Sequence, residues 1–125
     1  MEIDIQSLSA GLRYKLMASL ITPRPIALIT TVSAQGITNA APFSLFNMLG
    51  EDPPLIFVSI NPHPDGRRKD TAVNIRRTGE FVVHMSDRSI AKQMQRCSDQ
   101  LPPHISELEH AGLTGVPSIK VRPDR

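Results

Sequence analysis

The chain has 125 residues, of which 40% are hydrophobic and 21% are charged, so it suits one folded domain spanning residues 1–125. Its formal net charge of +2 lacks the strongly basic balance of a dedicated nucleic-acid binder, and no binding of nucleic acid is expected. No stretch approaches the ~20 apolar residues that span a membrane. The acidic N-terminal segment does not resemble a signal peptide, so a cytoplasmic protein is expected.

A helix and a hairpin are predicted in the first third of the chain. Residues 9–20 predict a short helix, because three leucines recur every four positions on one face. Residues 26–32 are apolar and β-branched, which predicts a strand, and residues 37–42 are its returning partner. The loop between them contains Gly36, which can adopt the positive φ of a tight turn.

The middle of the chain is less regular. Residues 43–50 match neither the helical nor the strand period, so no element is predicted there. A turn at 51–54 leads into residues 55–60 (LIFVSI), which are predicted to form a buried strand. Residues 61–68 form a loop rich in Pro, Gly and Asp.

The second half alternates helices and one strand. A helix capped by Asp70 or Thr71 is predicted through about residue 78, with Gly79 just beyond its end. Residues 80–85 predict another strand. Amphipathic spacing predicts a helix over 88–97, capped by Asp87, and a last short helix covers 104–111 before Gly112. No element is predicted for the tail.

The predicted strands number four, which is too few to close a barrel. The sheet therefore stays open, or its closure needs further chain. The expected fold is mainly β with short helices.

The most informative segment for function is NAAPFSLFN, residues 39–47. Its two alanines are small enough for a planar ligand or another backbone to approach closely, and Ser44 and Asn47 offer polar groups beside them. The alternative is an ordinary loop anchored by its two phenylalanines.

A second segment carries clustered positive charge. Five basic residues fall within eleven positions: Arg67, Arg68, Lys69, Arg76 and Arg77. Lys69 precedes a helix N-terminus, which presents unpaired N–H groups, so Lys69, Arg68 and the Thr71 hydroxyl make a phosphate site. The alternative is a solvated basic loop before a capped helix. Nucleic-acid binding is disfavoured, because no aromatic residue interleaves the cluster.

Other side chains give weaker signals. Thr30 and Thr31 suit the edge of a heterocycle, although most threonines in strands reflect β propensity. The four histidines lack metal-ligand spacing, so no metal site is expected. Cys97, the single cysteine, excludes an intramolecular disulfide and is predicted to be a buried thiol rather than a nucleophile. No catalytic acid or nucleophile is proposed.

Taken together, these segments resemble the flavin reductase-like FMN-binding proteins. The residues that carry the resemblance occur in the family's order and spacing: PRPIALITT (23–31), G-x-x-N-A-A-P-F-S-x-F-N (36–47), DPPLIFVSI (52–60), RKDT (68–71), NI (74–75) and TGEFVV (78–83). The helix at 88–97 and the AGLTGVPS segment (111–118) are also similar to this family. The motifs are specific as a set, although each alone is weak.

The resemblance implies an FMN-binding split β-barrel that forms a homodimer, with the flavin near the subunit interface. It assigns each candidate residue to one part of the cofactor. Thr30 and Thr31 would line the isoalloxazine. Ser44, Phe46 and Asn47 would contact the flavin or its ribityl chain. At the phosphate end it places four residues: Asn61, Lys69, Asp70 and Thr71.

The implied activity is that of an FMN-dependent oxidoreductase that reduces flavin with NAD(P)H. Two alternatives stay open: an electron carrier that passes electrons from bound FMN to an acceptor protein, and a non-catalytic dimerising or binding module that has lost the cofactor. Family members generally continue past the last residue of this chain. The resemblance therefore implies a C-terminally truncated domain that lacks later barrel strands and part of the dimer surface.

Overall fold

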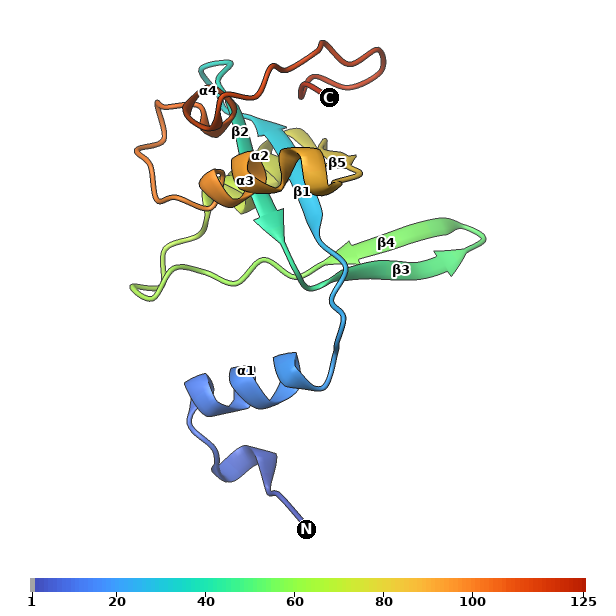
Figure 1. Ribbon diagram of the computed structural model, residues 1–125, viewed down its shortest axis with the longest axis vertical. Helices are drawn as coiled ribbons and strands as arrows, with labels where there is room; N and C mark the ends of the chain where they lie inside the picture. Colours follow the sequence, from blue (N-terminus) through green and yellow to red (C-terminus); the bar gives the residue numbers. More distant parts are fainter. Residues whose placement is uncertain (1) are drawn as a thin grey trace.

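A computed structural model describes residues 2–125; Met1, the first residue of the expected domain, lies outside them. Over this range the strands are β1 (Ala27–Val32), β2 (Thr38–Phe43), β3 (Phe46–Glu51), β4 (Pro54–Val58) and β5 (Val82–His84). The helices are α1 (Ala10–Ser19), α2 (Asp70–Thr78), α3 (Ala91–Arg96) and α4 (Glu107–Ala111), with 3-10 turns η1 (Ile5–Ser7) and η2 (Arg88–Ile90). Figure 1 shows a sheet covered by α3 and α4, from which α1 and the β3–β4 hairpin project.

The predicted β1–β2 hairpin is confirmed. The strands pair antiparallel from Ala27 opposite Phe43 to Val32 opposite Thr38. Gly36 in the connecting turn has a φ of 81°, as its position in the turn predicts. Strand β5 pairs antiparallel with the other side of β1, so the sheet order is β2-β1-β5 and β2 is an outer strand.

The β3–β4 hairpin corrects two predictions. Residues 46–51 form a strand where none was predicted, and a register shift between Met48 and Gly50 explains why they show no clean alternation. The strand predicted at 55–60 is present as β4, but the prediction that it is buried is wrong, because Leu55, Ile56 and Phe57 are 45%, 46% and 45% exposed. The ribbon projects beyond the sheet (Figure 1). Its base packs against the sheet through Phe46 and Val58, whereas the apolar side chains farther along the ribbon are exposed.

The predicted helices are present, with corrected boundaries. Helix α2 ends as predicted at Gly79, whose φ is 68°. Its N-cap is Lys69 rather than Asp70 or Thr71, and no side chain caps it. Asp87 does cap the next helical segment, accepting from the Ser89 N–H at 2.7 Å, but this segment divides into η2 and α3. Helix α4 begins at residue 107, three residues later than the predicted segment.

Hydrophobic side chains pack on both faces of β1, because successive strand residues point to opposite faces. On one face Leu28 packs with a cluster from β2, the C-cap of α3, and α4: Ala40, Cys97, Leu108 and Ala111. On the other face Ala27 and Ile29 pack with Phe43 and with partly buried residues from β3, β4 and β5. No helix among the described residues is long and apolar enough to cross a membrane.

Candidate functional site

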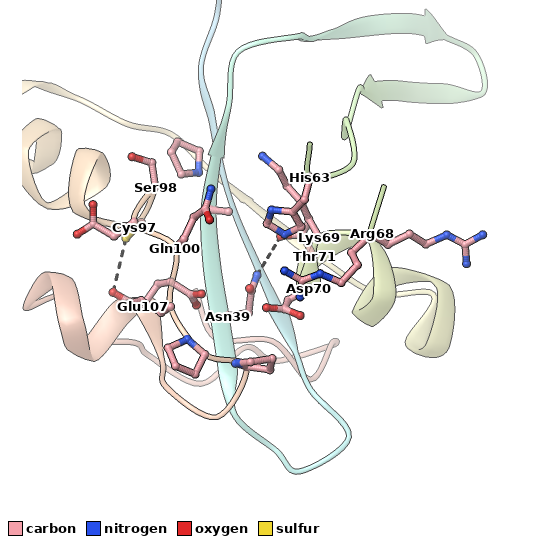
Figure 2. A pocket seen from close by; sticks show the side chains of 17 residues that line it. Asn39, His63, Arg68, Lys69, Asp70, Thr71, Cys97, Ser98, Gln100 and Glu107 are labelled. Carbon is pink, nitrogen blue, oxygen red and sulfur yellow. Dashed lines mark hydrogen bonds between the residues drawn. The ribbon is translucent and has the colours of Figure 1, made fainter. Parts of the chain in front are cut away.

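A cavity of about 450 Å³ lies between β2, the loop that enters α2, and the segment that follows α3. Its walls come from distant parts of the chain: Asn39, Ala41 and Pro42 of β2; His63 and residues 67–71; residues 97–103; and Glu107. In Figure 2, His63, Lys69 and Thr71 lie together on one side of the cavity, and Cys97, Ser98 and Gln100 lie on the other. The volume is within the range of small-molecule sites, roughly 300–1,000 Å³.

The side nearest α2 is cationic. The first turn of α2 has no side-chain cap, so its N–H groups remain available to a ligand. Lys69 stands at this N-terminus, with its Nζ atom 5.8 Å from the centroid of the Phe43 ring. Arg67 is paired with Asp65 at 2.7 Å, and this hydrogen bond lowers the pKa of the Asp65 carboxyl. Lys69 makes no ion pair with any residue in the described range.

A buried polar network fixes α2 to the sheet behind this cationic side. The Asn39 Nδ2 group donates to Oγ1 of Thr31 at 3.2 Å and to Oγ1 of Thr71 at 3.0 Å. Asn74 on α2 donates to the same Thr31 oxygen at 3.0 Å. Because these four side chains are buried and mutually bonded, the N-terminus of α2 has a defined position beside β2.

The structure brings three of the nine predicted site residues into the cavity wall: Lys69, Asp70 and Thr71. Thr30 and Thr31 are fully buried and point to opposite faces of β1. The Thr30 hydroxyl bonds to Nε2 of His84 at 2.9 Å and donates to the carbonyl of Asp124. The contact of these two threonines with an isoalloxazine stays a prediction.

The remaining four predicted site residues, like the two threonines, do not line the cavity. Ser44 follows Phe43, the ring under Lys69, and its hydroxyl accepts from Nη1 of Arg24 at 3.0 Å. Phe46 packs against the cluster around Ile29. Asn47 is exposed and its side chain accepts from the next backbone N–H, and Asn61 is exposed in the loop after β4. Their assignments also stay predictions.

The sequence reasoning missed several wall residues, of which Glu107 is the most unusual. Its side chain comes from α4, is 8% exposed, and accepts from the Ala40 N–H at 3.1 Å through Oε2. Burial raises the pKa of this carboxyl, and the charge of Asp70 adds to the effect. No local pattern marks Glu107. Asn39, also missed as a site residue, lies in the NAAPFSLFN segment that was predicted to be functional.

Cys97 also lies in the wall, and the prediction of a buried thiol is confirmed. It is 2% exposed, and burial raises its pKa to about 11. Its Sγ atom contacts the carbonyl of Glu107 at 3.7 Å, as the dashed line in Figure 2 shows. A thiol with this pKa is neutral near pH 7 and is not an activated nucleophile. Residues 2–125 contain no cluster of three His, Cys, Asp or Glu side chains able to hold a metal ion.

Comparison with solved structures identifies the fold. Component B of nitrilotriacetate monooxygenase from Bacillus cereus is 40% identical, with a TM-score of 0.91 over 98% of this chain and 61% of that one. A flavin reductase with a split barrel domain from Shewanella frigidimarina is 28% identical, with a TM-score of 0.80 over all of this chain and 62% of that one. The expected β-rich split-barrel fold with short helices is confirmed.

Comparison with protein families and curated relatives identifies the lineage. An uncharacterised protein of Halalkalibacterium halodurans is 48% identical over 94% of this chain and 56% of its own length. The chain thus spans about half the length of the curated relatives it matches. The model of the flavin reductase-like domain matches residues 17–123. The chain therefore belongs to the flavin reductase-like domain family.

Proposed function

We propose that this chain carries the FMN site of an NAD(P)H-dependent flavin oxidoreductase. The observation that supports this best is the uncapped N-terminus of α2, with Lys69 beside it, opening into a cavity of about 450 Å³. Because the chain spans only part of its relatives, the activity of the whole protein is part of the proposal.

The chemistry of the cavity fits a flavin phosphate and its ribityl chain. The Lys69 ammonium and the free N–H groups of α2 suit a phosphate, because they combine positive charge with directed donors. The Asp70 carboxylate does not suit a phosphate, but it can accept from a ribityl hydroxyl. Ala41 and Pro42 supply an apolar wall on β2.

In this proposal the protein positions the reacting ring and controls solvent, and no side chain acts as acid or nucleophile. Bound FMN would supply the redox chemistry, taking a hydride from NAD(P)H. Lys69 and the first turn of α2 hold the phosphate. The network of Asn39, Thr71 and Asn74 keeps that turn in register with β2, so the ligand meets a preorganised site.

Two measurements test the proposal. Titration of the purified chain with FMN, followed by flavin fluorescence, should saturate at one flavin per chain. NAD(P)H oxidation in the presence of free flavin should then be catalysed. Binding without NAD(P)H oxidation would favour the electron-carrier alternative, and absence of binding would favour the module that has lost the cofactor.

We also propose that a second copy of the chain covers α1 and the β3–β4 hairpin. Both elements project from the sheet (Figure 1). Both carry exposed apolar side chains. Leu20, the C-cap of α1, is 71% exposed, and Met48 and Leu49 on β3 are 67% and 68% exposed. Apolar side chains gathered on projecting elements mark an interaction surface. Light scattering of the purified chain distinguishes a dimer, as proposed, from a monomer.

A further inference from the structure

The outer edge of β2 is closed by side chains instead of by another strand. The Ser106 hydroxyl donates to the carbonyl of Thr38 at 2.7 Å, and the Ala40 N–H donates to Oε2 of Glu107 at 3.1 Å. An outer strand presents unpaired backbone groups along its edge. Two consecutive residues at the start of α4 thus satisfy backbone groups of β2 two positions apart.

One of these two contacts reaches the candidate site and the other does not. Ala40 lies between Asn39 and Ala41, which both line the cavity, and Glu107 lines it directly. Ser106 does not line it. Glu107 also lines a second cavity of about 260 Å³ near α2, together with Asn39 and Asp70. Its side chain therefore lies between the two cavities.

We propose that Glu107 is a positioning residue for the candidate flavin site: its buried carboxyl holds β2 at Ala40 and thereby sets the wall formed by Asn39 and Ala41. The contribution of this wall to flavin binding rests on the proposed function. The structural role of Glu107 in fixing β2 does not depend on that function, because it follows from the hydrogen bond to Ala40 alone.

The charge state of Glu107 matters to this role. The titratable groups around it are Asp70 on α2, Cys97 after α3 and His110 on α4. Burial and, less strongly, Asp70 disfavour the carboxylate. The backbone N–H groups of Glu107 and Ala40 and, more weakly, His110 favour it, but burial outweighs them and the pKa is raised. An ionised Glu107 would place a second negative charge beside Asp70, facing the cavity proposed for a phosphate. The neutral form holds β2 without that repulsion.

The structural half of the proposal is tested by amide hydrogen exchange at Ala40. Glu107→Ala should speed exchange of this amide by about tenfold or more, as expected for a lost hydrogen bond. Glu107→Gln retains an acceptor oxygen and should restore protection, which also guards against misfolding of the alanine variant. Ser106→Ala, the matched control, should leave Ala40 protected. Unchanged exchange at Ala40 in Glu107→Ala would overturn the proposal.

The functional half is tested by FMN affinity at several pH values. Glu107→Ala should weaken FMN binding by about tenfold, whereas Glu107→Gln and Ser106→Ala should bind at wild-type strength at acidic pH. As pH rises, the wild type should lose FMN affinity relative to Glu107→Gln. The ratio of the two dissociation constants at each pH is the quantity to compare, because ionisation of the FMN phosphate affects both proteins equally. A constant ratio at all pH values would refute the role of charge. If the wild type binds no FMN, the proposed function fails, and exchange at Ala40 still decides whether Glu107 holds β2.

Discussion

The Nζ atom of Lys69 lies 5.8 Å from the centroid of the Phe43 ring, and this contact joins the two segments that the sequence marked as functional. Lys69 belongs to the basic segment before α2, and Phe43 ends β2 in the NAAPFSLFN run. The proposed phosphate-binding cation and the segment predicted to contact the flavin or its ribityl chain are therefore neighbours in space, as one ligand touching both would require.

Replacing Lys69 tests the phosphate assignment. Lys69→Ala should weaken FMN by about 1.5–3 kcal/mol, because a charge-assisted hydrogen bond is lost, and should leave riboflavin binding nearly unchanged. Parallel fluorescence titrations with the two flavins measure the difference. Lys92→Ala on the exposed face of α3 is the matched control and should bind both flavins normally. An equal loss for FMN and riboflavin would show that Lys69 does not contact the phosphate.

Removing Asn39 tests the buried network. Asn39→Ala deletes the donor to both Thr31 and Thr71 and leaves a cavity between β2 and α2. The free energy of unfolding should fall by about 1–3 kcal/mol in urea denaturation. Asn47→Ala, at an exposed position of β3, should change it by less than about 0.5 kcal/mol. Similar values for both variants would mean that the network contributes little.

Glu107 predicts a pH dependence of stability. Its pKa is raised in the folded chain by burial and then by Asp70, so the folded state binds its proton more tightly than the unfolded state. The stability that this proton contributes is present below the ordinary carboxyl pKa and is lost as pH rises through the raised value. Glu107→Gln should therefore gain stability relative to the wild type on going from acid to neutral pH. A difference in free energy of unfolding between the wild type and Glu107→Gln that stays constant across pH would contradict the raised pKa of Glu107.

Charging the projecting hairpin tests the dimer. Leu49→Asp should convert the dimer to monomers while preserving the fold, because Leu49 is 68% exposed in the single chain. Met85→Asp is the control, since Met85 is 94% exposed beyond the end of β5. Light scattering gives the mass and circular dichroism the fold. A monomeric wild type would contradict the proposed dimer.

Local signals predicted much of the fold. The apolar, β-branched run at 26–32 and Gly36 specified the β1–β2 hairpin, and Gly79 marked the end of α2. Strand β3 was missed because its bulge removes the alternation that identifies a strand. The exposure of Phe57 and its neighbours was not predictable, because an apolar run does not reveal whether another layer covers it.

The candidate site was predictable only where its residues adjoin in sequence. Lys69, Asp70 and Thr71 share a helix start, which the sequence placed correctly to within one residue although no side chain caps it. Glu107 reaches the cavity from 67 positions beyond Ala40, its backbone partner, and nothing near it in the sequence signals that contact. Long-range packing, rather than local propensity, brings it there.

Titration of the purified 125-residue chain with FMN tests the central claim most directly. Flavin fluorescence and the visible spectrum should show saturable binding of one FMN per chain, and Lys69→Ala should weaken it. Absence of binding by the well-folded chain would contradict the claim that the cavity beside α2 is sufficient as an FMN site.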